Sequence, residues 1–91
     1  MAKLRLEHDL LGSKEVPADV YYGIQTQRAL ENFPITGYRP HKEMVFALAM
    51  VKKAAALANM KVRQLDRKIG DAIVKAADEI LEGKFMDQFV V

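Results

Sequence analysis

The chain has 91 residues, 51% of them hydrophobic, and it carries 14 Lys and Arg against 12 Asp and Glu, a net charge of +2. A chain of this length buries only about 60–65% of its unfolded surface, so its own core is marginal and some apolar surface is expected to serve something outside it. The charges alternate in sign and form no basic stripe, which excludes a nucleic-acid-binding surface. Cysteine is absent, so disulfides, thiolate nucleophiles and zinc–thiolate sites are excluded as well.

The beginning of the chain bears on its location in the cell. Its first residues carry charges where a signal peptide needs an apolar run. The longest uncharged stretch after them, Met44 to Val51, is too short to cross a bilayer. We therefore expect a soluble, cytoplasmic protein with neither a membrane nor a nucleic acid as partner.

The first predicted element is a short strand. Residues 4–9 alternate apolar and polar side chains, the period of a half-buried strand, with Leu4 and Leu6 as the apolar set. A turn over residues 10–13 and an extended stretch over 15–17 should follow.

A first helix is predicted from Asp19, its N-cap, to Phe33, where Pro34 ends it before a loop that runs to Pro40. At 100° per residue its packing face is expected to contain Tyr22, Thr26, Ala29, Leu30 and Phe33, and its opposite face Ile24, Arg28, Glu31 and Asn32.

A second helix is predicted from His41 to Arg63. Its apolar residues form two stripes on nearly opposite sides, one of Met44, Leu48, Val51, Ala55 and Val62 and one of Phe46, Met50 and Leu57, and only a narrow strip of Lys52, Asn59 and Arg63 is polar. A helix that is apolar over most of its circumference is a buried helix, and its short neighbours cannot cover it.

A third helix should begin at the N-cap Asp66 and end before Gly83, the predicted C′ residue. Its apolar face is expected to contain Ile69, Ile73, Ala76 and Ile80. The chain then ends on three apolar residues, 89–91, where we expect it to be interrupted. The fold class predicted is mainly α, with about three helices preceded by an extended N-terminal segment with one or two short strands.

Few residues carry chemistry. His8 and His41 have no serine, cysteine or carboxylate partner at a motif spacing, and structural roles are favoured for both, with His8 beside Asp9 as a strand-edge pair. The acidic group of Asp78, Glu79 and Glu82 lies on the polar side of the third helix, which is typical of a solvated face and not of a metal site. Met44, Met50 and Met60 have the spacing of core residues.

Arg28 is the one candidate binding residue. A guanidinium on the polar side of the first helix can bind a carboxylate bidentately, although an exposed structural arginine is favoured on composition alone.

Read whole, the chain resembles the opening of the aspartate ammonia-lyases of the class II fumarase/aspartase superfamily. The segments that carry the resemblance are 5–12, 15–23, 25–35, 51–59 and 76–84, and Asp87-Gln88-Phe89 is similar to the lead-in to the family's first active-site loop. Tyr21-Tyr22-Gly23 is similar to aspartases, where class II fumarases tend to have Leu-Trp-Gly, whereas Gln25-Thr26-Gln27-Arg28 is shared with fumarases; Val90 departs from a proline that many relatives have.

The resemblance implies reversible elimination of ammonia from L-aspartate to give fumarate, in a homotetramer and without an organic cofactor. It implies that residues 1–91 are the N-terminal domain of a longer lyase and pack on the rest of the protomer. The family's serine base and its signature loops are not in this sequence, so no catalytic residue and no metal ligand is assigned, and the fragment alone is expected to be inactive. Arg28 corresponds to a candidate binding residue for the dicarboxylate substrate.

Two alternatives stay open. The first is the N-terminal part of a class II fumarase, because the residues that separate aspartate from malate are not among these 91. The second is a self-standing helical interaction module whose apolar stripe binds a partner helix. An activating metal in the full-length enzyme is also undetermined.

Overall fold

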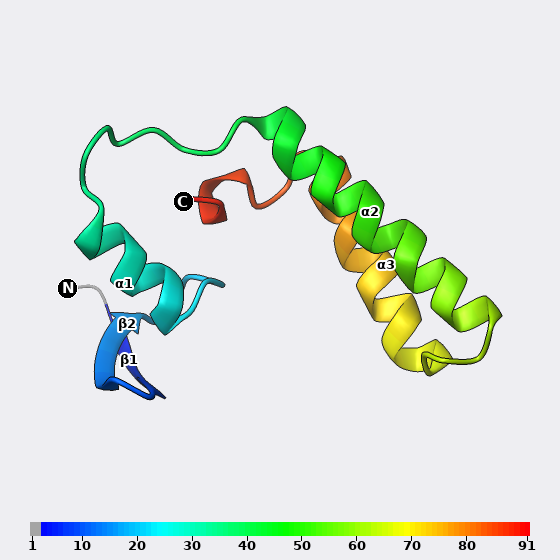
Figure 1. Ribbon diagram of the computed structural model, residues 1–91, viewed down its shortest axis with the longest axis horizontal. Coiled ribbons are helices and arrows are strands. Elements are labelled where there is room, and N and C mark those ends of the chain that lie inside the picture. Colours follow the sequence, from blue (N-terminus) through cyan, green and yellow to red (C-terminus); the bar gives the residue numbers. More distant parts are fainter. Residues whose placement is uncertain (1–2) are drawn as a thin grey trace. The chain divides into compact units, whose positions relative to one another are not determined.

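The computed structural model describes residues 3–91. In chain order its elements are β1 (Leu4–Asp9), β2 (Gly12–Pro17), α1 (Ile24–Asn32), α2 (Lys42–Lys61), α3 (Arg67–Leu81) and a short 3-10 helix (Met86–Gln88) (Figure 1). The predicted fold class, mainly helical with a short extended N-terminal part, is confirmed. No helix in the described part of the chain is both long and apolar enough to cross a membrane.

The chain divides into two compact units. The first unit contains the chain up to Pro40 together with Asp87–Val91, and the second contains His41–Met86.

In the first unit, β1 and β2 form an antiparallel hairpin whose turn is Leu10-Leu11. The strand prediction for residues 4–9 is confirmed, but the predicted face is wrong. Leu4 and Leu6 point outward and are 53% and 61% exposed, while Arg5, Glu7 and Asp9 on the other side of the strand are half-buried. The polar side of β1 faces inward because the segment that follows β2 offers backbone groups for its side chains to bind.

The helix α1 packs on both strands of the hairpin, and it begins later than predicted. Its N-cap is Gly23, with no side-chain cap, and not Asp19. The predicted packing face is wrong in part: Ile24, assigned to the opposite face, is buried, and Phe33 is 69% exposed, whereas the other residues of the predicted face are half-buried. Helical periodicity located the helix without showing which side the hairpin covers.

In the second unit, the caps follow the local sequence closely. The Asp66 side chain accepts hydrogen bonds from the backbone N–H groups of Lys68 and Ile69, which confirms it as the N-cap of α3. Gly83 has a φ of +93° and occupies the C′ position, since its N–H bonds to Ile80 O while Lys84 N–H reaches Glu79 O. The predicted α2 differs from the observed one by a residue or two at each end.

The two long helices of this unit, α2 and α3, lie side by side and antiparallel (Figure 1). The face of α2 on α3 contains the buried Val45, Ala49 and Ala56, and the face of α3 contains the buried Gly70 and Ala77. Small side chains let the helices approach closely. The stripe with Met44, Leu48, Val51 and Val62 is exposed, as are Met50 and Leu57 of the opposite stripe, which agrees with the expectation that the neighbouring helices cannot cover them. The predicted apolar face of α3 is not its packing face, because Ile69 and Ile73 are exposed.

Candidate functional site

The polar side of β1 carries a row of three charged side chains, Arg5, Glu7 and Asp9. Residues two apart on a strand share one face, so all three point at the chain segment that follows β2. Each of them binds a different part of residues 17–28. The row therefore connects the first strand to the start and the middle of α1.

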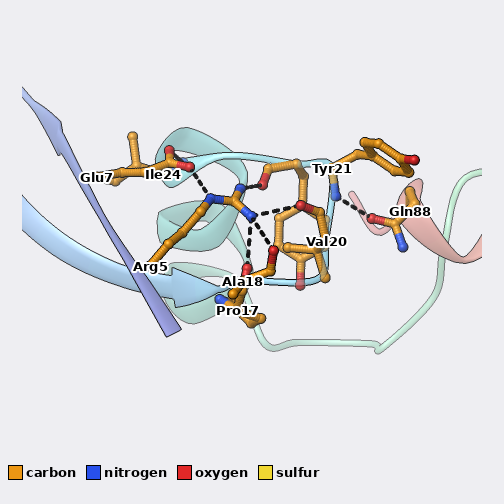
Figure 2. Close-up of polar contacts among 9 residues, drawn as sticks. Arg5, Glu7, Pro17, Ala18, Val20, Tyr21, Ile24 and Gln88 are labelled. Atoms are coloured by element: carbon orange, nitrogen blue, oxygen red, sulfur yellow. Dashed lines mark hydrogen bonds and ion pairs between the residues drawn. The ribbon is translucent and has the colours of Figure 1, made fainter. Parts of the chain in front are cut away.

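Arg5 is the centre of a backbone turn (Figure 2). Its Nη1 donates to the carbonyl oxygens of Pro17 at 2.9 Å, Ala18 at 3.3 Å and Val20 at 2.7 Å. Its Nη2 donates to Tyr22 O at 2.6 Å. The backbone carbonyl groups that Arg5 binds converge on its guanidinium, and the segment that contains them forms no helix before Gly23, so the N-cap predicted at Asp19 is wrong.

Glu7 connects Arg5 to the beginning of α1. Its Oε2 accepts from Arg5 Nε at 2.6 Å, and its Oε1 accepts from the backbone N–H of Ile24 at 2.8 Å. The hydrogen bond from Arg5, followed by that from Ile24, holds the pKa of the Glu7 carboxyl below its ordinary value. Glu7 thus accepts a hydrogen bond from a backbone N–H at the N-terminus of α1 that has no partner within the helix. The N-cap residue Gly23 has no side chain that could do so.

Asp9 and Arg28 form a bidentate ion pair. Arg28 Nε donates to Asp9 Oδ2 at 2.8 Å, and Arg28 Nη2 donates to Asp9 Oδ1 at 2.9 Å. Gln25 Nε2 also donates to Asp9 Oδ2, at 2.9 Å. The side chains of Asp9 and Arg28 are only 9% and 21% exposed. The Arg28 hydrogen bond lowers the pKa of Asp9, and the same bond raises the pKa of Arg28.

The geometry of this pair decides what Arg28 is free to do. Asp9 occupies the Nε–Nη2 edge of the guanidinium, and a weak contact from Nη2 reaches Gly12 O at 3.4 Å. Within the described residues, the Nη1 amine makes no hydrogen bond. Asp9 therefore holds Arg28 by one edge of the guanidinium, and Nη1 retains donors for one more acceptor. Arg28 is thus an ion-paired residue and not the exposed arginine that composition alone favours.

The two histidines lie apart from this row of contacts. His8 Nδ1 and Ser13 Oγ are 2.6 Å apart across the hairpin, where the two residues are register partners. Asp9 turns to Arg28 and not to His8, so the three residues do not form a catalytic triad. His41 is the N-cap residue of α2 but contributes no side-chain cap bond.

The acidic residues of α3 lie along an open, shallow hollow of about 470 Å³ together with Lys75 and Lys84. Asp78 is paired with Lys53 at 2.6 Å, and Glu82 lies 3.5 Å from Lys84. Among residues 3–91, no three His, Asp or Glu side chains are grouped so that they could hold a metal ion.

Sequence reasoning missed the roles of Arg5 and Glu7. The signal that could have found them is the spacing Arg-x-Glu-x-Asp on one side of a strand, followed by a segment without helical pattern. Apolar side chains usually face the interior, so the alternating leucines of β1 indicated that their side of the strand is buried, whereas the charged side is the half-buried one.

Comparisons with known proteins give a consistent result. A family model described as "Lyase" matches residues 12–91. The aspartate ammonia-lyase of Bacillus subtilis (strain 168) is 70% identical over 87 residues, which are 96% of this chain and 18% of that protein. The class II fumarate hydratase of Halobacterium salinarum is 54% identical over 87 residues, again 96% of this chain and 18% of that protein.

A solved structure, the native form of a fumarate lyase:delta crystallin from Brucella melitensis, superposes with a TM-score of 0.87 at 52% identity. The match covers 96% of this chain and 20% of that one. The chain thus spans less than a fifth of the length of the curated relatives described above.

Proposed function

Because this chain belongs to the lyase family that its sequence matches over residues 12–91, we propose that it supplies the N-terminal domain, residues 1–91, of an aspartate ammonia-lyase. The reaction is the reversible elimination of ammonia from L-aspartate to give fumarate. A base removes a proton from the carbon next to one carboxylate, and the electron pair of that C–H bond forms the C=C bond. The C–N bond breaks, and its electron pair leaves with the nitrogen of ammonia. The observation that carries this proposal is the 70% identity to the Bacillus subtilis enzyme.

The rival activity is fumarate hydration, which is favoured by the 54% identity to a class II fumarate hydratase. The two reactions share a dicarboxylate framework and differ in the leaving group. The higher identity to the Bacillus subtilis aspartate ammonia-lyase, 70%, favours ammonia as the leaving group.

We assign Arg28 the role of a substrate-binding residue that donates to a carboxylate of the substrate through Nη1. Its support is the geometry of the ion pair, in which Asp9 orients the guanidinium and leaves that amine without an acceptor among the described residues. Charge-assisted hydrogen bonds from arginine to a carboxylate are strong and directional. No catalytic residue is assigned to this chain.

The exposed apolar stripes of α2 indicate that another part of the protein, or another subunit, packs on this helix. Met44, Leu48 and Val51 are each more than half exposed, as is Met50 on the opposite side. Exposed apolar surface on this scale marks an interface. We propose that the remaining part of the protomer and other subunits of a cytoplasmic homotetramer cover it, and that the enzyme needs no organic cofactor.

A chimaera tests the proposal. Residues 1–91 of this chain replace the matching segment of the Bacillus subtilis enzyme, and the purified protein is assayed with L-aspartate and with fumarate plus water. We expect deamination of aspartate at a rate within about tenfold of the unmodified enzyme, and no activity from the 91-residue chain alone, which lacks the base and the donors that supply most of the rate.

The possible outcomes separate the alternatives. A folded chimaera without deaminase activity contradicts the proposal. The substrate preference of the enzyme from which this chain comes decides between the two lyases: fumarate hydration without aspartate deamination assigns it to the fumarases. Fumarate formation by the isolated chain would show that the active site lies within these residues.

A further inference from the structure

The segment Ala18–Gly23 has no regular secondary structure, yet its path is closely determined. Four carbonyl oxygens between Pro17 and Tyr22 converge on the guanidinium of Arg5, and Glu7 holds the same guanidinium from the other side (Figure 2). Residues outside helices and strands usually owe their order to side chains of this kind, because their backbone groups need partners.

One peptide group in this segment has both of its ends bound. The Val20 carbonyl oxygen accepts from Arg5 Nη1 at 2.7 Å, and the N–H of the same peptide, that of Tyr21, donates to Gln88 Oε1 at 2.7 Å. A trans peptide is planar, and its C=O and N–H point in opposite directions. The arginine that fixes the carbonyl therefore also fixes the direction of the N–H.

Gln88 lies 67 residues further along the chain, in the short 3-10 helix. Phe89 and Val90, which follow it, are half-buried. The bond from Tyr21 is thus a connection between the start of the first unit and its last residues, Asp87–Val91.

We infer that Arg5 is a positioning residue for the segment Asp87–Val91, and that it acts through the Val20–Tyr21 peptide and the Gln88 amide. The consequence for catalysis rests on the proposed function, in which this segment continues into the rest of a lyase. The consequence for structure does not depend on it.

Arginine is required at this position for a geometric reason. The guanidinium presents its N–H donors in a rigid plane: Nε donates to Glu7, the two N–H groups of Nη1 are shared among three backbone carbonyl oxygens, and Nη2 donates to a fourth. A lysine ammonium has three donors and no fixed plane, so it cannot hold the same set of carbonyl groups.

The structural arm of the test measures amide hydrogen exchange in the purified chimaeric lyase. In the Arg5→Lys variant, exchange at the Tyr21 amide and in residues 87–91 should accelerate about tenfold. Gln88→Leu, which removes the acceptor, should have the same effect at Tyr21, and Gln88→Glu, which keeps an acceptor oxygen, should have little. Arg39→Lys, an exposed residue of the loop before α2, is the matched control and should change nothing.

The kinetic arm uses the chimaeric lyase. Arg5→Lys and Gln88→Leu should each lower kcat/KM about tenfold, the double variant should fall no further, and Gln88→Glu should restore most of the loss. If Arg5 were only structural, its variants would lower the melting temperature and leave kcat/KM unchanged.

The outcomes are separable. An Arg5→Lys chimaera whose exchange at Tyr21 and in residues 87–91 is unchanged overturns the inference, and so does a Tyr21 amide that is unprotected in the unsubstituted chimaera. An inactive chimaera counts against the proposed function, and the exchange arm still decides the role of Arg5. Additive losses in kcat/KM would mean that Arg5 acts by another route than Gln88.

Discussion

Arg28 uses one edge of its guanidinium for an ion pair and leaves the Nη1 amine available for a second interaction, which the proposed function assigns to the substrate. Its Nε–Nη2 edge is bound by Asp9, and its Nη1 amine makes no hydrogen bond within residues 3–91. Removing the whole side chain would therefore affect the hairpin and the proposed substrate site together. A substitution that separates them is more informative.

The first prediction concerns Arg28→Lys in the chimaeric lyase. The ammonium keeps the ion pair with Asp9, so the melting temperature should change little, but it cannot also present Nη1, so kcat/KM should fall about tenfold. Arg28→Ala should lower kcat/KM roughly a hundredfold and lower the melting temperature, because Asp9 loses its partner.

The matched control for Arg28 is Lys14→Ala. It breaks a neighbouring ion pair between the hairpin and α1, that with Glu31 at 2.5 Å, without touching Arg28. Its kcat/KM should stay normal. A normal kcat/KM in Arg28→Lys, with the melting temperature retained, would remove Arg28 from the substrate site.

The second prediction is acid destabilisation of the first unit. The pKa values of Glu7 and Asp9 lie below their ordinary values of 4.5 and 3.8, because Arg5 and Arg28 respectively hydrogen-bond to the charged carboxylates. Groups with a lowered pKa stabilise the folded state fully above the unfolded pKa, and they lose that contribution as the pH falls through the folded one. Stability should thus be level from neutrality to about pH 5 and fall below about pH 4.

Thermal unfolding of the chain from pH 7 to pH 2, followed by circular dichroism, measures this effect. The variant Asp9→Asn should be less stable at pH 7 and should lose less on acidification than the unsubstituted chain. Identical pH curves for the two proteins would show that Asp9 does not contribute through its charge.

At the scale of elements, the contact between α2 and α3 depends on small residues, and Gly70 is the tightest point. A Cβ added to Gly70 would overlap the side chain of Met60, including its Cγ, which is close to the backbone and cannot move away easily. Glycine inside a helix is unfavourable by itself, so its presence here follows from the close approach.

The third prediction is that Gly70→Ala destabilises the helix pair although alanine is the better helix former. Relief of the glycine penalty gains about 1 kcal/mol, and overpacking costs about 1–3 kcal/mol, so the net loss should be about 1 kcal/mol. Chemical denaturation measures it. In a Met60→Ala background, where the overlap is absent, the same substitution should instead stabilise, and a stabilising Gly70→Ala in the unsubstituted chain would contradict the packing.

The elements that sequence reasoning predicted well are those with local causes. The third helix could be located by Asp66 and Gly83, since each satisfies backbone groups of its own helix. The beginning of α1 could not, because it depends on Arg5 and Glu7, which are distant in sequence. The buried faces of β1, α1 and α2 were also missed, since periodicity gives the sides of an element and only tertiary contacts choose among them. Arg28 was predicted as a candidate, but its partner Asp9 was not.

At the scale of the whole molecule, more apolar surface is exposed than a small chain usually leaves open. Leu10 and Leu11 of the hairpin turn, Leu48 of α2 and Val62 directly after α2 are each more than half exposed. Burial of such surface stabilises by about 25 cal/mol per Å² before the costs of association, which is a sufficient driving force for contacts between chains.

The fourth prediction is that the isolated 91-residue chain self-associates or is partly molten in solution. Light scattering at several concentrations should give a mass above that of a 10.3 kDa monomer, rising with concentration. Leu48→Lys combined with Val51→Lys, on the exposed stripe of α2, should reduce the association, whereas Lys52→Arg should not. A monomer with sharp, dispersed amide resonances would contradict the prediction.

The division of the chain into two units has a consequence for the order in which the protein is made. The second unit is continuous, His41–Met86, whereas the first needs both the chain up to Pro40 and the residues from Asp87 onward. Synthesis proceeds from the N-terminus, so the helix pair, whose contacts are local, is complete at the ribosome before the last part of the first unit has emerged. The Tyr21 amide can bind Gln88 only after 67 more residues have been translated, so the segment between β2 and α1 is among the last parts of the first unit to reach its final set of contacts.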